Sequence, residues 1–388
     1  MTASRAAIED PELIARVRND VAASFGPAAL LALYADRDRR GLLRERVRAA
    51  AGRPLDVDDA EALCAELFGF GPLQPLLDDP SVTDVLVNRA SELFVERDGR
   101  LQPAGVTFRD AAHLADLVYR IAASVGRELT VEQPFVDARM RDGSRANAVI
   151  EPVGGPTLCI RKFSRASIPL EGPRPSWTSA GLPAAAALLL RTAVSQRANV
   201  VISGATAAGK STLLRSLAAG IPSDERLIVI EDTTELVLPH PHAVHLECVP
   251  GRDGAGVRVA DLVANALRMR PDRIIVGEVR TPSEASALLE ALSTGHDGSL
   301  TTLHAGSACD ALVRLELLLA RAGELGSEAI RRHVANAIDV VVHVARGPEG
   351  ERRVREIVEV DDADPHVLWH QGSPDVAPSR GRLGARAR

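Results

Sequence analysis

One short segment combines glycine, lysine and serine in an order suited to binding phosphate. It reads Gly204-Ala-Thr-Ala-Ala-Gly209-Lys210-Ser211, and it lies between an apolar run, Val200–Ser203, and a helical pattern, Ser211–Leu217. Backbone amides of such a loop and of the helix that follows point toward phosphate oxygens. Lys210 would neutralise the β- and γ-phosphates of a nucleotide, and the Ser211 hydroxyl would hold Mg²⁺. The predicted phosphate-binding residues are Gly204, Ala205, Thr206, Ala207, Ala208, Gly209, Lys210, Ser211 and Thr212.

Two carboxylates that follow other apolar runs are candidates to hold the metal or to orient water. Glu278 ends Arg273-Ile-Ile-Val-Gly-Glu, and Glu231 with Asp232 ends Leu227-Ile-Val-Ile-Glu-Asp. In a parallel sheet these acids would emerge at the carboxyl edge, where ligands bind. Each could instead be an exposed acid that caps the following turn. We predict catalytic roles for Glu278 and Glu231 and metal binding by Ser211 and Glu278, and the sequence leaves open which acid is the base.

A histidine and an arginine lie close in sequence to these strand ends. His304 follows the apolar run Ser299–Leu303, and Arg280 lies just beyond Glu278. At that edge His304 would bond the γ-phosphate or the attacking water, and Arg280 joins the candidate catalytic residues. His296, a little upstream, is explained equally well by a structural role. No Ser/His/Asp arrangement or zinc-ligand spacing competes with this interpretation.

The bulk composition narrows the class of protein. The 388 residues carry a formal charge of −6 and 3% aromatic residues, so general nucleic-acid binding is not expected. Four cysteines lie far apart without a Cys-x-x-Cys pair, which argues against a zinc ribbon and against a disulfide framework. The amino terminus lacks an apolar signal sequence, and the apolar run Ala184–Leu190 is too short to cross a bilayer. We expect a cytoplasmic protein that meets a membrane only through partners.

Periodicity divides the chain into segments of different character. The chain begins with apolar residues at helical spacing and continues with short strands around one amphipathic helix. A Pro- and Ser-rich stretch follows. Beyond it, apolar strands alternate with helices, a pattern that favours an α/β fold with a parallel sheet covered on both faces. The predicted organisation is a helical segment at 1–70, a small α/β domain at 71–163, a linker at 164–183, a P-loop domain at 184–360 and a disordered tail at 361–388.

In this order, the motifs resemble those of the secretion and pilus-assembly ATPases of type II and type IV secretion systems. The closest likeness is to the branch that drives tight-adherence (Flp-type) pili, and it covers roughly residues 65 to 345. Besides the phosphate loop, the similar segments are an acidic box at Ile230–Leu236, a Walker B segment at Leu267–Arg280, a histidine box at Gly295–Ala305, and the amino-terminal segments Phe70–Leu77, Ser81–Asn88, Val136–Arg139, Asp142–Arg145 and Ile160–Phe163.

The resemblance implies a RecA-like P-loop domain and a small amino-terminal domain that clasp ATP and Mg²⁺ within a homohexameric ring. It also implies that arginines of the first domain reach the triphosphate, with Arg145 and Arg161 as candidates and Arg139 behind them. Lys162, the only lysine besides Lys210, lies in the same strip of sequence. The implied activity is ATP hydrolysis that drives an inner-membrane platform protein of a secretion or pilus machine.

The phosphate loop departs from the family pattern, which usually reads Gly-Gly-Thr-Gly-Ser-Gly-Lys-Thr, at Ala205, Ala207 and Ala208. If Ala207 adopts a positive φ, the strain is about 1–2 kcal/mol and would weaken nucleotide binding. Because Lys210 and both acids are retained, we expect turnover. Two alternatives stay open: a conjugative or nucleic-acid-translocating RecA-like motor, and a nucleotide-binding switch without turnover.

Overall fold

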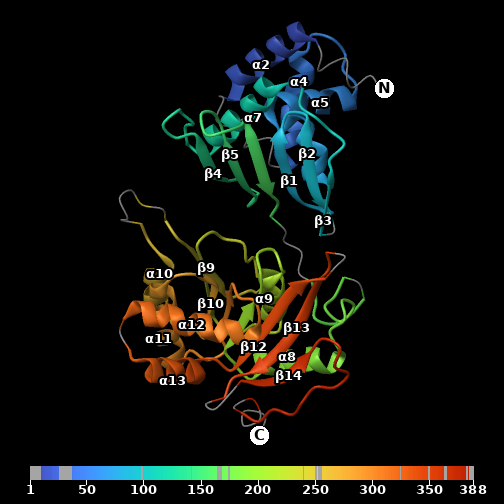
Figure 1. The fold of residues 1–388 in the computed structure, drawn as a ribbon. Helices are drawn as coiled ribbons and strands as arrows, with labels where there is room; N and C mark the ends of the chain where they lie inside the picture. The colour runs from blue at the N-terminus through green and yellow to red at the C-terminus, as the bar shows by residue number, and fades with distance from the viewer. Residues whose placement is uncertain are drawn as a thin grey trace. The chain divides into compact units, whose positions relative to one another are not determined.

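The structure, a computed structural model, divides into two compact units, Met1–Ser164 and Arg165–Arg388 (Figure 1). We call them the amino-terminal unit and the carboxy-terminal unit. Within the described ranges, no helix combines the length and the apolar character that crossing a membrane requires. The described residues are 10–25, 37–97, 99–140, 142–163, 168–173, 175–238, 240–249, 251, 256–323, 325–347, 350–361, 365–381 and 383.

The amino-terminal unit begins with helices whose apolar side chains pack into one small core. They are α2 (Pro11–Phe25), α4 (Arg37–Ala50) and α5 (Val57–Phe68). The Asp56 side chain caps α5 by accepting the Asp59 amide at 2.7 Å, since the first amides of a helix lack intrahelical acceptors. Residues 1–9 and 26–36 of the predicted helical segment lie outside the described residues. The structure places these helices in one compact unit with the sheet that follows.

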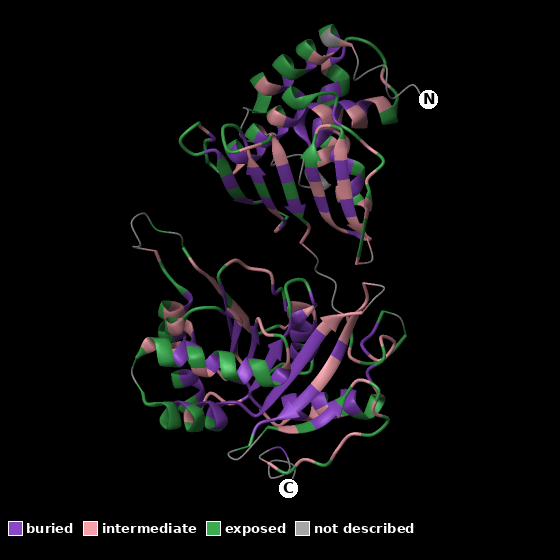
Figure 2. Ribbon diagram, viewed as in Figure 1, coloured by how far each residue is buried: buried purple, intermediate pink, exposed green. Residues whose placement is uncertain are grey.

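A six-stranded antiparallel sheet with helices packed on one face completes this unit. Its elements are η1 (Gly71–Leu73), α6 (Gln74–Asp78), β1 (Val82–Arg89), β2 (Glu92–Arg97), β3 (Arg100–Pro103), α7 (Ala111–Ser124), β4 (Phe135–Arg139), β5 (Arg145–Val149) and β6 (Thr157–Arg161). The strand order is β3-β2-β1-β6-β5-β4. Buried and exposed residues alternate along β4, β5 and β6, as Figure 2 shows. Buried side chains of α7 and of the strands share one core, so the opposite face of the sheet is open.

The carboxy-terminal unit is built on an eight-stranded sheet in the order β14-β13-β12-β7-β11-β10-β8-β9. The strands are β7 (Val200–Ser203), β8 (Leu227–Glu231), β9 (Ala243–Glu247), β10 (Arg273–Val279), β11 (Leu300–Leu303), β12 (Val340–Arg346), β13 (Arg352–Glu359) and β14 (His366–His370). Pairing is parallel from β12 to β9, which confirms the predicted parallel sheet around the phosphate loop. β13 and β14 extend the sheet with antiparallel pairing that the sequence analysis did not predict.

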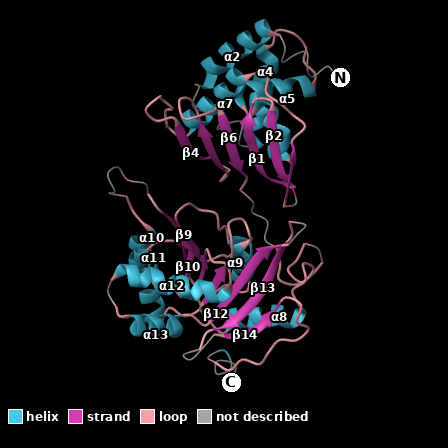
Figure 3. Cartoon of the chain, in the orientation of Figure 1, coloured by secondary structure: helices cyan, strands magenta, loops and turns pink. Residues whose placement is uncertain are grey.

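Helices cover both faces of this sheet (Figure 3). They are α8 (Ala184–Ser195), α9 (Lys210–Ala218), α10 (Val259–Ala266), α11 (Pro282–Ser293), α12 (Ala308–Ala322) and α13 (Ser327–Ala337). Val200 and Ile202 of β7 pack in a core with α8 and α9, whereas Val201 packs in a second core with α10 to α13. This alternation explains why the strands consist of continuous apolar runs, because each successive side chain enters a different core.

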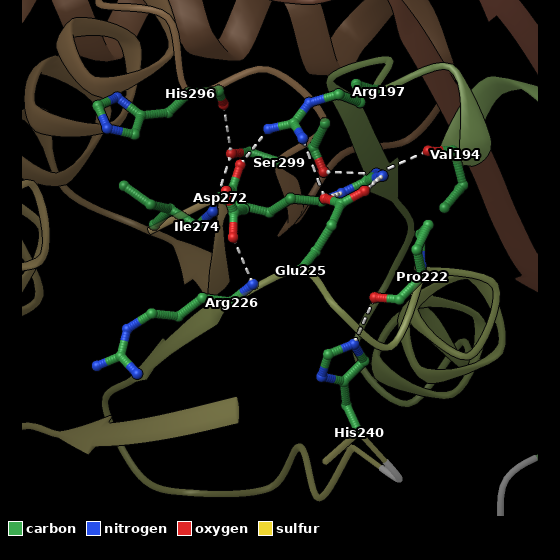
Figure 4. Close-up of polar contacts among 12 residues, drawn as sticks. Val194, Arg197, Pro222, Glu225, Arg226, His240, Asp272, Ile274, His296 and Ser299 are labelled. Atoms are coloured by element: carbon green, nitrogen blue, oxygen red, sulfur yellow. Dashed lines mark hydrogen bonds and ion pairs between the residues drawn. The ribbon is translucent and has the colours of Figure 1, made fainter. Parts of the chain in front are cut away.

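A buried charged network ties together the starts of the parallel strands (Figure 4). Arg273, the first residue of β10, is fully buried and donates to both oxygens of Glu225, at 2.6 and 2.9 Å. Its Nη1 donates to the Val194 carbonyl at 2.7 Å, and Arg197 donates to Glu225 at 3.2 Å. The two-pronged pair fixes the segment leading into β8 against the start of β10.

The described part of the predicted linker belongs to the carboxy-terminal unit. Trp177 is buried in the core formed with α8 and α9, and its Nε1 donates to Ser216 Oγ at 2.8 Å. A buried aromatic ring with a satisfied N–H contributes far more to packing than the surrounding Pro- and Ser-rich composition indicates. The predicted residues 164–167 and 174 lie outside the described residues.

The described part of the predicted disordered tail is folded, which corrects that expectation. It forms β14, whose Trp369 is buried in the same core as Trp177. The buried carboxylate of Glu359 accepts the Ser379 hydroxyl at 2.6 Å and the Arg380 amide at 2.9 Å. Local composition missed this because the contacts are long-range. Residues 362–364, 382 and 384–388 lie outside the described residues.

We predict that Glu225→Gln lowers the free energy of unfolding by about 3 kcal/mol, because it removes the charge that compensates the buried Arg273. Urea unfolding followed by circular dichroism measures the change. Glu328→Gln is the matched control, since it breaks the exposed ion pair of Arg332 with Glu328 at 2.7 Å and should leave the transition unchanged. Equal behaviour of the two variants would contradict the role given to the buried pair.

Candidate active site

The phosphate loop (Gly204–Ser211) joins the end of β7 to the start of α9, as the sequence predicts. Gly204 and Gly209 have φ of +159° and +104°. A Cβ at Gly204 would lie 2.4 Å from the Val344 carbonyl oxygen, and one at Gly209 would lie 2.8 Å from Arg352 Cδ. Both positions therefore require glycine. The first amides of α9, which have no acceptor within the helix, are the groups suited to binding a phosphate.

Ala207 adopts the left-handed conformation that the sequence analysis considered, with φ of +59°. For an alanine this conformation costs about 1–2 kcal/mol. The Ala207 carbonyl accepts a hydrogen bond from Arg346 Nε at 2.9 Å. Sequence reasoning missed Arg346 and its cross-strand neighbour Arg352. Gly347 and Gly350, which follow the apolar run Val340–Ala345, are a turn signal that could have drawn attention to this segment.

The Lys210 ammonium lies over the phosphate loop. Its Nζ donates to the carbonyls of Gly204 and Ala205, both at 3.1 Å, and lies 3.1 Å from His304 Nδ1. Burial lowers the pKa of Lys210, and the charge of Glu278 partly opposes this shift. With Lys210 donating to Nδ1, the proton of a neutral His304 ring lies on Nε2.

A continuous chain of polar contacts runs from Lys210 across the carboxyl edge of the sheet. His304 Nε2 lies 2.8 Å from Glu278 Oε1, and Arg280 Nη2 lies 2.7 Å from Glu278 Oε2. Arg280 Nη1 continues the chain to Asp232 Oδ2 at 3.3 Å. Burial, followed by the charge of Lys210, lowers the pKa of His304, which favours the neutral ring. The structure thus brings together Lys210, His304, Glu278 and Arg280, all predicted from the sequence.

Glu231 lies apart from that chain of contacts. Its carboxylate is 5% exposed and accepts the amides of Glu235 at 2.9 Å and Leu236 at 3.0 Å. A Cβ at Gly277 would lie 2.8 Å from Glu231 Cγ, so Glu231 also packs tightly against β10. Burial raises the pKa of Glu231 to about 7. These contacts make Glu231 an anchor for the acidic segment that follows β8.

His296 lies at the amino-terminal end of β11, the end opposite His304 (Figure 4). Its carbonyl accepts the Ser299 hydroxyl at 2.9 Å, and its Nδ1 lies 3.1 Å from the Ala291 carbonyl oxygen. These contacts support the structural interpretation of His296. The structure does not bring it to the phosphate loop, since β7 and β11 run parallel.

The arginines predicted to reach the triphosphate form a row on the open face of the amino-terminal sheet. Arg139 pairs with Arg145 across β4 and β5, and Arg145 pairs with Arg161 across β5 and β6. Arg161 faces Asp84 of β1, and its Nε donates to Asp84 Oδ1 at 3.0 Å. Residues paired in register share a face, so the row is a surface of concentrated positive charge. The neighbouring Lys162 instead donates to the carbonyl of Asp79 at 2.5 Å, a structural contact.

The residues at the phosphate loop are compatible with Mg²⁺. Among the described residues, no group of three or more His, Cys, Asp or Glu side chains is arranged to hold a metal. Mg²⁺ at a phosphate loop needs no such group, because a hydroxyl, phosphate oxygens and water complete its shell. Ser211 lies in the first turn of α9. Glu278 Oε1 is a buried oxygen without a well-aligned hydrogen bond, although His304 Nε2 lies 2.8 Å away.

We predict that Glu231→Gln removes a pH dependence of stability. The pKa of Glu231 is raised from 4.5 to about 7 in the folded chain, so the folded state favours the protonated carboxyl. This contribution to stability is complete below about pH 4.5 and is lost as the pH rises through 7. Relative to the variant, the wild type should lose on the order of 2–3 kcal/mol between pH 5 and pH 8. Urea unfolding at several pH values measures this, and parallel profiles would refute it.

Comparison with known proteins identifies relatives over most of the chain. Residues 66–384 match the family model described as type II/IV secretion system protein. A Mycobacterium tuberculosis protein, named provisionally for conjugal transfer, is 37% identical over 343 residues that cover 84% of this chain and 96% of that protein. The type IV secretion system protein VirB11 of Brucella suis biovar 1 is 36% identical over 310 residues, which cover 72% of this chain and 85% of VirB11.

A solved structure supports the fold. That of the ATPase DotB from Legionella pneumophila matches with a TM-score of 0.55 and 24% identity, over 74% of this chain and 80% of DotB. The predicted α/β, RecA-like fold class is confirmed. The family match includes both sheets and β14, whereas α2 and α4 precede it. Since it spans most of the chain and contains the phosphate loop, the chain belongs to the type II/IV secretion system protein family.

Proposed function

We propose that this secretion-system ATPase hydrolyses ATP on the phosphate loop, with Lys210, His304 and Glu278 as the residues that act on the γ-phosphate and water. The observation that carries the proposal is the contact chain from Lys210 to His304 at 3.1 Å and on to Glu278 at 2.8 Å. Lys210 neutralises phosphate charge that grows in the transition state. The neutral His304 ring lies between Lys210 and Glu278, with its Nε2 2.8 Å from Glu278 Oε1.

Glu278, rather than Glu231, is the acid proposed to orient the attacking water. Its side chain is 17% exposed and lies beside His304. The carboxylate of Glu231 is more deeply buried and already accepts backbone amides. A carboxylate that must contact water and a phosphate cannot be saturated by the backbone of its own loop. Glu231 would act indirectly, by holding the acidic segment in place.

Ser211 and Glu278 are the proposed protein groups around Mg²⁺. When bound, the ion supplies positive charge to the β- and γ-phosphate oxygens. Ser211 provides the hydroxyl from the first turn of α9, and the buried Glu278 oxygen provides negative charge nearby. Because Arg280 contacts the other oxygen of Glu278 at 2.7 Å, it keeps one side of that carboxylate oriented.

The arginine row of the amino-terminal sheet is proposed to stabilise the triphosphate during turnover. Arg145 and Arg161 are the contacting residues, and Arg139 adds to the local field. Arginine suits this role because its planar fork donates two hydrogen bonds to phosphate. Asp84, at the end of the row, holds Arg161 in position through its 3.0 Å hydrogen bond.

Family membership supports the proposed assembly, a homohexamer at the cytoplasmic face of the inner membrane. There it would push a membrane platform protein of a secretion or tight-adherence pilus machine, with opening and closing of its two units converted into motion. The provisional name of the M. tuberculosis relative favours conjugal transfer as a second candidate role. Stimulation of ATP hydrolysis by single-stranded DNA would favour this second role, and its absence would favour the protein motor.

We predict that Lys210→Ala abolishes measurable ATP hydrolysis and that Glu278→Gln lowers kcat by about 10²–10⁴-fold with a small change in KM. Glu231→Gln should cost less than about tenfold, because Glu231 acts through the acidic segment. Phosphate release by the purified full chain with Mg²⁺ measures all three. A larger loss of kcat in Glu231→Gln than in Glu278→Gln would reverse the assignment of the two acids.

We predict that Arg145→Ala and Arg161→Ala each lower kcat/KM by about 10²-fold, because each removes charge that stabilises the phosphoryl group. Arg89→Ala is the matched control, since Arg89 is an exposed arginine of β1 outside the row. It should leave turnover unchanged. Loss of activity in all three variants alike would show a general charge effect rather than a contact with the triphosphate.

A further inference from the structure

A β-ribbon made of β12 and β13 contacts the phosphate loop. The Val344 carbonyl of β12 lies so close to Gly204 that a Cβ there would approach it to 2.4 Å. Arg346, at the end of β12, donates from Nε to the Ala207 carbonyl at 2.9 Å. The stem of Arg352, the cross-strand neighbour of Arg346, packs against Gly209. The ribbon thus contacts the loop at its beginning, middle and end.

Arg346 contacts the loop at Ala207, where the backbone conformation is unfavourable for the residue present. Ala207 has φ of +59°, which an alanine adopts much less readily than glycine does. The hydrogen bond from Arg346 forms on the carbonyl of this same residue, so its strength depends on the orientation of the adjoining peptide plane. Stabilising this peptide plane favours the left-handed conformation over the right-handed alternative that alanine prefers.

We propose that Arg346 is a positioning residue that compensates for Ala207 by holding the phosphate loop in its binding conformation. This role goes beyond the proposed function and depends on it only in that the nucleotide binds the phosphate loop. The β12–β13 ribbon then serves as the support on which a loop with alanine at this position keeps its phosphate-binding shape.

Replacing Arg346 should change the apparent Kd for nucleotide by changing the fraction of molecules whose phosphate loop is in the binding conformation. The apparent Kd equals the intrinsic Kd divided by the fraction of molecules in the competent conformation. If loss of Arg346 lowers that fraction from about one half to about one tenth, the apparent Kd rises about fivefold. In the Ala207→Gly variant the competent fraction is higher both with and without Arg346. Loss of Arg346 in that variant therefore raises the apparent Kd by only about twofold. Arg346 and Ala207 should therefore be strongly non-additive.

The test is a double-mutant cycle on the full chain, with the dissociation constant of ADP and Mg²⁺ measured by titration calorimetry. The variants are Arg346→Ala, Ala207→Gly and their combination. Arg353→Ala is the matched control, because Arg353 pairs with Ala345, faces away from the Arg346–Arg352 pair and contacts Glu351 at 2.7 Å. Its affinity for ADP should equal that of the wild type.

The expected result is a rise in Kd of about fivefold for Arg346→Ala in the wild-type background and about twofold or less in the Ala207→Gly background. An equal rise in both backgrounds would overturn the proposal, because it would mean that Arg346 contacts the nucleotide directly. No rise in either background would overturn it too. Should Arg346→Ala fail to fold, Ala207→Gly alone remains decisive: tighter ADP binding supports the proposal and weaker binding contradicts it. Failure of the wild-type chain to bind ADP would instead refute the proposed nucleotide site itself.

Discussion

Parallel pairing of β7 with β11, and of β11 with β10, determines which side chains meet at the carboxyl edge of the sheet. In this register Lys210, at the start of α9, meets His304, which follows β11, and Glu278, near the end of β10, at one edge of the sheet. A slip of one residue would turn alternate side chains to the opposite face and separate them. At the opposite edge, where the parallel strands begin, the buried Arg273 pairs with Glu225 and also donates to the Val194 carbonyl. One edge is thus closed by polar contacts, whereas the other carries the groups suited to a ligand.

The features that the sequence predicts well are those encoded by neighbouring residues. The phosphate loop has its own spacing, and Thr281 with Glu284 forms the reciprocal cap at the start of α11 that these residue types favour. The features that it misses depend on distant contacts. β13 contains three arginines and two glutamates among its eight residues, and its apolar side chains become informative only when β12 pairs with them. Trp177 lies in a stretch with linker composition, yet its partner Ser216 is on α9.

The two candidate acids illustrate the same limit within the site. Glu231 and Glu278 both follow apolar strands, and the local pattern gives no reason to distinguish them. The sheet order distinguishes them, because β10 is next to β11 and places Glu278 beside His304. Glu231 on β8 instead meets the amides of its own following segment, beginning with Glu235. Strand order is a global property, so residues with the same local pattern acquire different electrostatic surroundings.

The row of Arg139, Arg145 and Arg161 has a consequence for the energetics of the amino-terminal unit. Like charges on neighbouring strands repel one another, and Asp84 offsets this repulsion where it pairs with Arg161. A polyanion bound at this row would add favourable interactions with the arginine side chains. By linkage, such an anion would stabilise the fold of this unit, and the stabilisation would be larger for an anion that binds more tightly. If that anion is the nucleotide, as proposed, the stability of the amino-terminal unit would depend on the charge of the nucleotide that is bound.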